Sequence, residues 1–351
     1  MHNFIAKVLN LKQIVTILGI ESSCDDTSVA IIQNNTLLSS VIANQDVHKK
    51  YGGVVPELAS RAHQSNIVPV LHEALLQANL QLNDIDAIAY TRGPGLLGSL
   101  LVGSSFAKGL SIGLQKPLIE VNHLQGHILS HFLSEKDEQK EFPSFPHLSL
   151  LVSGGHTQLI HVHSPYRFEI LGTTIDDAAG EAFDKAAKVI GLGYPGGPII
   201  DKLAKLGNPH KYKFAKPQIE GLNFSFSGLK TSFLYFLRDQ LKTNPNFIQD
   251  NINDLCASYQ NTIAEILIEK ALKAIETTQI KTITLGGGVS ANSEIRKRFE
   301  ELKNKGIKTF IPKIKYTTDN AAMIAVVGYY KFLNNDFSTL DAAPIARFGI
   351  S

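Results

Sequence analysis

The sequence has few cysteines and no tryptophan. Its 351 residues contain two cysteines, Cys24 and Cys256, and two methionines. So few thiols exclude the disulfide framework of small secreted proteins and suit a reducing cytoplasm. The chain must instead be stabilised by buried apolar surface, and its length at about 150 residues per domain indicates roughly two domains.

An excess of one charge and a long hydrophobic run are also lacking. Lys and Arg number 34 against 32 Asp and Glu, a net charge of +2, which neither requires nor excludes a nucleic-acid partner. No apolar run approaches the roughly 18 residues of a membrane helix, so we expect no membrane segment and a cytoplasmic location. Residues 1–13 have no signal-peptide cleavage site and are expected to be an N-terminal extension, with an organellar targeting sequence as the alternative.

Strand-like and helix-like segments alternate along the chain, which predicts an α/β protein. An apolar run at 14–20, a polar turn and a second run at 29–32 form a strand–turn–strand pattern. The same pattern recurs about 130 residues later, at 147–152 and 158–162. We interpret the repeat as two similar lobes; a chance likeness between two hairpins is the alternative.

A charged stretch that ends in prolines, residues 134–146, is expected to separate the lobes. The N-terminal lobe is then 14–133, completed by a C-terminal helix at about 319–346, and the C-terminal lobe is 147–318. Apolar residues at helical spacing also predict helices at 56–80, 255–278 and 320–333.

Two histidines at helical spacing follow a predicted strand. Asn122 is a suitable N-cap, and His123 and His127, at i and i+4, then lie on one face of the helix. Imidazoles so placed can bind iron, zinc or a similar divalent metal, although a plain pair of core or surface histidines remains the alternative. Leu124 stands where a zinc protease needs glutamate, which excludes that chemistry. Asp319 is a candidate third ligand or an ordinary N-cap.

Glycine-rich turns form a second pattern, at 92–95, 153–157 and 286–292. Glycine lets backbone N–H groups approach a phosphate, and a following helix N-terminus favours an anion. None of the turns matches a Walker A loop or a dinucleotide fingerprint. Together they favour nucleotide binding, and Asp184 on a nearby predicted helix can accept hydrogen bonds from a ribose, or can lie on a solvated face.

Taken together, these motifs resemble the TsaD family, the universal tRNA threonylcarbamoyladenosine transferases, once labelled glycoprotein endopeptidases. The resemblance extends from about Ile17 to about Ala346. It rests on strings that occur in the family's order: ILGIESSCDDTS, YGGVVPELASRAH, TRGPGLLGSLLVG, HLQGH, LLVSGGHTQL, DDAAGEAFDKAAKVIGLGYPGGP, FSFSGLKT, GGGVSAN and TDNAAMIA.

The resemblance implies an actin, Hsp70 and sugar-kinase-like (ASKHA) fold, in which two duplicated ribonuclease-H-like α/β lobes surround a cleft. It implies transfer of a threonylcarbamoyl group from threonylcarbamoyl-adenylate to the exocyclic amine of the adenosine 3′ of the anticodon. The substrates are tRNAs that read ANN codons, and AMP is released. The resemblance also implies a TsaB-like paralogue and a TsaE-like ATPase as partners.

The family's functional residues map onto this sequence by motif. The metal ligands are His123, His127 and Asp319, with Fe²⁺ as the expected metal and zinc as the alternative. Asp25 and Asp26 are candidates for taking the proton of the amine; the family commonly has glutamate at position 26. The expected contacts of the adenylate donor are Leu151, Val152, Ser153, Gly154, Gly155, Asp184, Gly197, Asp201 and Asn292.

Two basic runs are candidates for binding the anionic tRNA backbone, although each can also be ordinary solvated surface. They comprise Lys202, Lys205, His210, Lys211, Lys213 and Lys216, and Arg296, Lys297, Arg298, Lys303, Lys305 and Lys308. The competing functions are an ASKHA-type small-molecule kinase and a non-catalytic ATP-binding scaffold. The paired histidines disfavour the kinase, whose magnesium prefers oxygen ligands.

Overall fold

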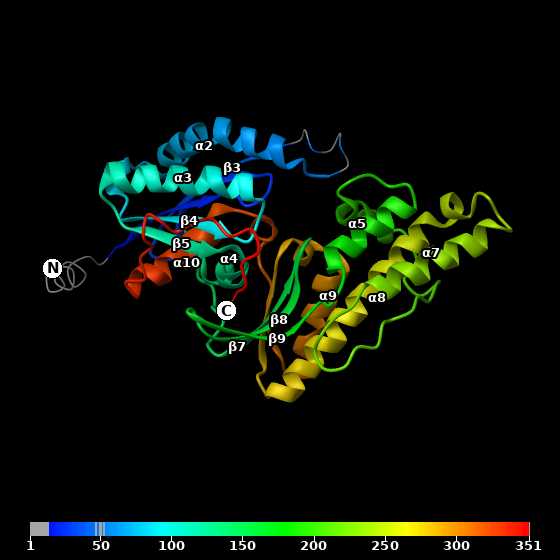
Figure 1. Cartoon of the computed structure of the whole chain (residues 1–351). Coiled ribbons are helices and arrows are strands. Elements are labelled where there is room, and N and C mark those ends of the chain that lie inside the picture. The colour runs from blue at the N-terminus through cyan, green and yellow to red at the C-terminus, as the bar shows by residue number, and fades with distance from the viewer. Residues whose placement is uncertain (1–13, 46–47, 49–50, 52, 351) are drawn as a thin grey trace. The chain divides into compact units, whose positions relative to one another are not determined.

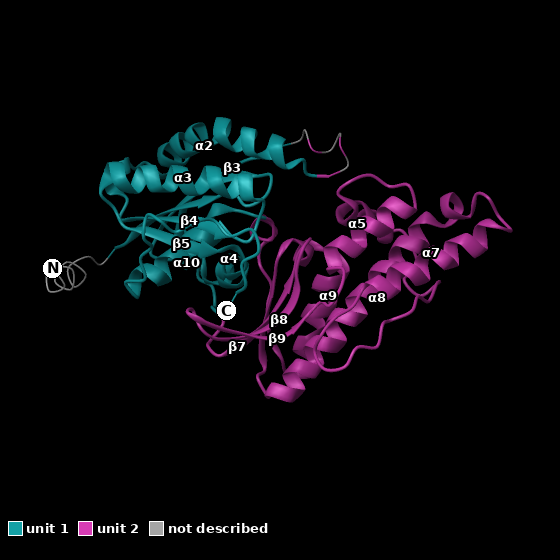
Figure 2. Ribbon diagram, viewed as in Figure 1, with its two compact units in different colours: residues 1–45, 54–142, 319–350 teal, residues 46–53, 143–318, 351 magenta. Residues whose placement is uncertain are grey.

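The computed structural model describes residues 14–45, 48, 51 and 53–350, so the expected extension at 1–13 lies outside the described residues. Contacts divide the chain into two compact units (Figure 2). Unit 1 comprises residues 1–45, 54–142 and 319–350, and unit 2 comprises 46–53, 143–318 and 351.

Unit 1 is a sheet with helices on both faces (Figure 1). Its strands are β1 (Thr16–Glu21), β2 (Thr27–Gln33), β3 (Thr36–Ala43), β4 (Ala87–Gly93), β5 (Leu118–Asn122) and β6 (Ser134–Glu135). Its helices are α2 (Pro56–Ala78), α3 (Leu97–Leu114), α4 (His123–Leu129) and α10 (Ala321–Leu333), with short 3₁₀ turns η2 (Leu82–Asp84) and η3 (Ser130–Phe132).

The strand order in unit 1 is β5-β4-β1-β2-β3-β6. Strands β1, β2 and β3 are antiparallel neighbours, whereas β4 runs parallel to β1 and β5 parallel to β4. Every residue of β1 is buried, as expected for a central strand covered on both faces. The short strand β6 pairs with β3, so part of the expected linker at 134–146 belongs to the sheet.

Alternate residues of β1 face different helices. Leu18 and Ile20 belong to the core cluster formed with α2 and α3. Gly19 faces the opposite way, where an added Cβ would lie 2.4 Å from the carbonyl oxygen of Ala321 at the start of α10. Helix α10 thus packs directly on the sheet backbone, and this close approach fixes where its N-terminus lies.

Helix α3 corrects the expectation of no long apolar segment. Its 18 residues have a mean hydropathy of 1.3, which by length and composition alone is enough to cross a membrane. It packs on β4 and α2, and its buried face is made largely of small residues such as Ser99, Gly103 and Ala107. One such helix is weak evidence of a membrane segment, and only 33% of α3 is buried in unit 1, with Leu97, Leu101 and Ile112 exposed.

Unit 2 also combines a sheet with helices (Figure 1). Its strands are β7 (His147–Val152), β8 (Thr157–Ser164), β9 (Arg167–Thr173), β10 (Thr282–Gly286) and β11 (Lys308–Phe310). Its helices are α5 (Ala179–Val189), α6 (Gly196–Ala204), α7 (Ser227–Leu241), α8 (Phe247–Thr278) and α9 (Ser293–Glu301). The 3₁₀ turns are η4 (Gly288–Ala291), η5 (Leu302–Lys305) and η6 (Ile314–Tyr316).

The sheet of unit 2 has the order β11-β10-β7-β8-β9. Strands β7, β8 and β9 are antiparallel neighbours, and β10 and β11 extend the sheet in parallel from β7. This order and these directions match β5-β4-β1-β2-β3 of unit 1. The duplication predicted from the repeated strand–turn–strand pattern is therefore confirmed.

Several predicted elements differ in their bounds. The C-terminal helix expected at about 319–346 is α10, which ends at Leu333, although residues up to 350 belong to unit 1. The first strand runs from Thr16 to Glu21 rather than from 14 to 20, so Glu21 is its last residue. Helix α8 begins at Phe247, eight residues before the predicted start at 255. Its first turns contain Phe247, Ile248 and Ile252, which pack in the core of unit 2, so the apolar pattern of this helix begins earlier than predicted.

Candidate metal centre and candidate nucleotide pocket

The two predicted histidines lie on helix α4 in unit 1. Asn122 caps this helix, because its side chain accepts a hydrogen bond from the N–H of Leu124 at 2.9 Å. His123 and His127 are buried, and their rings meet edge to face with centroids 4.8 Å apart. The predicted cap is confirmed, and both imidazoles lie on one side of the helix.

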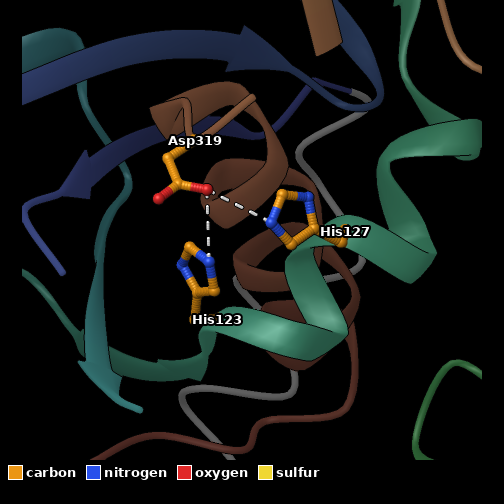
Figure 3. A group of neighbouring side chains, drawn as sticks. All are labelled: His123, His127 and Asp319. Carbon is orange, nitrogen blue, oxygen red and sulfur yellow. Dashed lines mark ion pairs between the residues drawn. The ribbon is translucent and has the colours of Figure 1, made fainter. Parts of the chain in front are cut away.

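Asp319 is not the N-cap of the following helix. Asn320 takes that place by accepting a hydrogen bond from the N–H of Met323 at 3.0 Å. The Asp319 carboxylate instead lies beside the imidazoles, with Oδ1 3.3 Å from Nε2 of His123 and 3.2 Å from Nε2 of His127 (Figure 3).

Packing between α4 and α10 brings these distant residues together. An added Cβ on Gly126 would lie 3.0 Å from Cγ of Met323, so α4 approaches α10 closely at its glycine. The histidines flank this glycine on α4, and Asp319 precedes α10. Residues nearly two hundred positions apart in the sequence therefore converge within unit 1.

Glu21, which the sequence reasoning missed, completes the surroundings of His123. It ends β1, is wholly buried, and its Oε2 lies 3.1 Å from Nδ1 of His123. The same oxygen accepts a hydrogen bond from the hydroxyl of Thr91 at 2.7 Å. A carboxylate on the far nitrogen orients a histidine whose other nitrogen binds a metal. A charged residue that ends an apolar strand was the only signal for it in the sequence.

The electrostatics of the cluster favour a cation. Burial opposes charge on His123, but Asp319 and Glu21 outweigh it and raise the pKa of this imidazole well above its usual value. Burial lowers the pKa of His127. Burial alone would raise the pKa of Asp319, yet the two imidazoles hold it well below its usual range. A divalent cation bound by these side chains would take the place of the proton that the two carboxylates stabilise on His123.

The donor atoms fit a metal. Within the described residues, both ring nitrogens of His127 are buried without a hydrogen-bond partner, because the contact with Asp319 lacks hydrogen-bond geometry. A buried polar atom left unpaired costs about 1–3 kcal/mol, so such an atom calls for an explanation. His123, His127 and Asp319 together offer two nitrogens and one oxygen, a mixed set that suits iron or zinc.

The loop that follows β1 holds the two candidate acids. His63 on α2 contacts this loop through the hydroxyl of Thr27 and the carbonyl of Cys24. Ser99 on α3 donates a hydrogen bond to the same carbonyl. Burial and then the charges of Asp25 and Asp319 raise the pKa of Asp26 to about 7. Asp26 is thus close to half ionised at neutral pH, the range that suits a proton acceptor.

Replacing Asp26 with asparagine should stabilise the metal-free protein more at pH 8 than at pH 5. Folding raises the pKa of Asp26 from 3.8 to about 7. The folded state then binds this proton more tightly, so wild-type stability falls as the pH rises through this window. Partial exposure limits the gain at pH 8 to ~1–2 kcal/mol. Urea unfolding at both pH values measures it, and an equal gain at the two values would contradict the assignment to ionisation.

Unit 2 contains a cavity of about 440 Å³. The glycine turn between β7 and β8 and the turns before α6 and α9 contribute to its wall, together with one side of α6. Its lining residues are Gly154, Gly180, Phe183, Asp184, Tyr194, Pro195, Gly197, Pro198, Asp201, Lys202, Lys205, Gly288, Val289, Ala291 and Asn292. A partly apolar cavity with a few acidic and amide groups is typical of a small-ligand site.

The predicted donor contacts divide into two groups. Five line this cavity: Gly154, Asp184, Gly197, Asp201 and Asn292. Leu151 and Val152 are instead buried in β7, and neither they nor Ser153 and Gly155 line it. Ser153 shapes the turn, because its carbonyl accepts a hydrogen bond from Gly180 N–H at 3.2 Å.

The acidic residues of the cavity also accept hydrogen bonds from backbone N–H groups in its walls. Asp184 Oδ1 accepts a hydrogen bond from Gly196 N–H at 2.7 Å, and burial raises the pKa of Asp184. Asp201 Oδ1 accepts one from Ser293 N–H at 3.0 Å, beside the Asn292 cap of α9. Both carboxylates are thus bonded to the chain, and Oδ2 of Asp201 also lies 3.4 Å from Nζ of Lys205, another residue of the cavity wall.

The third glycine turn, at 92–95, belongs to unit 1, and none of its residues lines the cavity of unit 2. Gly93 lies against the backbone of Ile345, where an added Cβ would be 1.9 Å from the carbonyl oxygen. Gly95 lies equally close to Ser23. This turn packs against other segments of unit 1, whereas residues of the other two turns line the cavity of unit 2.

The basic runs are partly neutralised. Lys211 pairs with Asp254 at 2.7 Å, and Arg298 pairs with Glu294 at 2.7 Å. Arg296 donates to the carbonyls of Ser290 and Pro312, and burial lowers its pKa. These side chains stabilise unit 2, which leaves fewer of the predicted cations available to tRNA.

Solved structures share this fold. The chain superposes on T.kodakarensis HypF with a TM-score of 0.62 at 15% identity, covering 92% of this chain and 48% of that one. On the (R)-2-hydroxyglutaryl-CoA dehydratase component A of Acidaminococcus fermentans the TM-score is 0.50 at 16% identity, covering 90% and 98%. The protein is thus of the ASKHA class, with two duplicated α/β lobes, as the resemblance implied.

Sequence comparison identifies the family. Residues 36–326 match TsaD, tRNA N6-adenosine threonylcarbamoyltransferase. A protein of that name from Porphyromonas gingivalis is 60% identical over 341 residues, covering 97% of this chain and all of the relative. One from Thermosipho africanus is 49% identical over 338 residues, covering 93% of this chain and 98% of the relative. The chain belongs to the TsaD family, which disfavours a small-molecule kinase and an ATP-binding scaffold.

Proposed function

We propose that this protein is an acyltransferase that places the threonylcarbamoyl group on the exocyclic amine of adenosine in tRNA. The observation that carries the proposal is the likeness to the Porphyromonas gingivalis tRNA N6-adenosine threonylcarbamoyltransferase, 60% identical over 97% of this chain. The acceptor is the adenosine 3′ of the anticodon in tRNAs that read ANN codons.

The donor is threonylcarbamoyl-adenylate, and its AMP half binds in the cavity of unit 2. The carboxylates of Asp184 and Asp201 accept hydrogen bonds from the ribose hydroxyls through their remaining lone pairs. Gly154 and Gly197 let the backbone approach the nucleotide closely, because neither has a side chain to fill the cavity. Lys202 and Lys205, which also line the cavity, supply positive charge near the phosphate.

The reaction exchanges one bond for another at the carbamoyl carbon. The adenosine amine attacks this carbon, the bond from carbon to the phosphate oxygen breaks, and AMP leaves with the electron pair. The amine nitrogen must also lose a proton, and Asp26 accepts it. The lone pair of this amine is delocalised into the ring, so catalysis depends on positioning and on stabilising the leaving phosphate.

His123, His127 and Asp319 hold a divalent metal, with Fe²⁺ as the expected ion and zinc as the alternative. When bound, the metal supplies Lewis acidity and fixes the orientation of the donor. Glu21 keeps His123 turned toward the site by contacting Nδ1.

The reaction takes place in the cytoplasm, with tRNA as one substrate. A TsaB-like paralogue and a TsaE-like ATPase assist it. Among the cations of the two basic runs, Lys297, Lys303 and Lys305 are those of α9 and η5 that we expect to contact tRNA, since all three are exposed.

A transfer assay tests the proposal. Purified protein with its TsaB-like and TsaE-like partners, tRNA and threonylcarbamoyl-adenylate should yield threonylcarbamoyladenosine, detected by mass spectrometry of the digested tRNA. Replacing the donor with ATP and a small-molecule hydroxyl acceptor should yield no phosphorylated product. Absence of the modified nucleoside with all components present would refute the proposal.

A further inference from the structure

The β8–β9 hairpin of unit 2 carries a second group of potential metal ligands. His161 and His163 come from β8, and Glu169 comes from β9. Their donor atoms all lie within 4.8 Å of one another. No part of the proposed transfer reaction uses these residues.

The strand geometry explains why the imidazoles meet. His161 lies directly opposite Glu169, so their side chains share one face of the sheet. The register between β8 and β9 shifts between Val162 and Ser164, which leaves His163 as an extra residue in β8. Side chains two residues apart on a regular strand are separated by roughly 6.5 Å, but such an irregularity re-aims a side chain. The ring centroids of the two histidines are only 3.7 Å apart.

The imidazoles are stacked at a tilt of 35°, and their nitrogens lie at distances from the Glu169 carboxylate that fit a metal. Nε2 of His163 is 2.9 Å from Oε2 of Glu169, and Nδ1 of His161 is 3.7 Å from the same oxygen. Ligands about 2.1 Å from a tetrahedral zinc are separated by roughly 3.4 Å, a value between these two.

Nδ1 of His161, which faces the Glu169 carboxylate, is the nitrogen placed to bind the metal, whereas Nε2 is buried without a hydrogen-bond partner among the residues that the structure describes. Arg167 on β9 opposes a cation, but it is exposed and water screens its charge.

We propose that His161, His163 and Glu169 form a second divalent transition-metal site, for zinc or a similar ion. Glu169 is 57% exposed, so the site opens to solvent, and water completes the coordination. Because β9 is the edge strand of its sheet, a bound ion would fasten this edge to β8. The site is independent of the proposed transferase chemistry.

Zinc titration of the full-length, chelator-treated protein tests this proposal. His163→Gln combined with Glu169→Gln changes two surface side chains of the cluster and leaves the partly buried His161 in place. We expect calorimetry with zinc chloride to show one site fewer per chain than in wild type. The lost site should have micromolar affinity, and zinc should no longer raise the melting temperature through it.

His210→Gln is the matched control, because it removes an exposed imidazole of unit 2 that lies outside the cluster. This variant should keep the wild-type number of zinc sites. Equal stoichiometry in wild type and the double variant would overturn the proposal. Since the comparison counts a difference of one ion, it holds whether or not the His123 cluster binds zinc, and it does not depend on transfer activity.

Discussion

Replacing His127 with alanine is expected to remove the metal from unit 1 and to reduce threonylcarbamoyl transfer at least ~10³-fold. A metal that polarises an oxygen contributes several kcal/mol to a transition state, and each 1.36 kcal/mol corresponds to about tenfold in rate. His127 is 1% exposed, and its nitrogens have no hydrogen-bond partner within the described part of the chain. Its loss therefore breaks no hydrogen bond of the fold, although it leaves a cavity under α4.

Metal analysis and the tRNA transfer assay together measure this effect. His131→Gln is the control, because His131 is also buried and lies one turn further along, outside the cluster. It should keep both the metal and most of the activity. If the His127→Ala protein were free of metal and still transferred at the wild-type rate, the cluster would have no part in the reaction.

Replacing Gly288 with leucine is expected to abolish nucleotide binding and to lower kcat/KM for the donor about 10²-fold or more. Gly288 lines the cavity of unit 2, and a Cβ added there would meet no described atom within 4 Å. The fold can accommodate the side chain for this reason, whereas the ligand must compete with it for space. We therefore expect an unchanged melting temperature and an unchanged metal content.

Calorimetry with AMP as the probe separates this effect from the chemistry of transfer. Gly113→Leu is the matched control, because Gly113 is an exposed glycine of α3 whose added Cβ also meets nothing described within 4 Å. It should bind AMP as wild type does. Wild-type AMP affinity in Gly288→Leu would show that the donor's nucleotide half binds elsewhere.

Local patterns predicted much of the fold. Strand and helix types follow from the spacing of apolar residues within a short window, and the repeated strand–turn–strand segments indicated two equivalent sheets. The same holds for Asn122, whose capping role depends only on the next two residues. Helix bounds were less predictable, as at α8, where polar residues separate Phe247 and Ile248 from the apolar run that starts at Leu255.

Contacts between distant segments escaped the sequence reasoning. Glu21 is remote in sequence from His123, and only the pairing of β1, β4 and β5 places it beside the imidazole. In the β8–β9 hairpin, only the shift in register brings His163 onto His161.

By itself the sequence determined the α/β class, the duplication, the spacing of His123 and His127 on one helix, and the family. The tertiary structure decided that Asp319 lies beside these histidines rather than capping α10, and which glycine turns line one cavity. The physical reason is the separation along the sequence over which each feature acts. Periodicity and capping depend on neighbours within a few residues. The convergence of α4 and α10 depends on how each packs on the sheet, at contacts such as Gly19 with Ala321 and Gly126 with Met323.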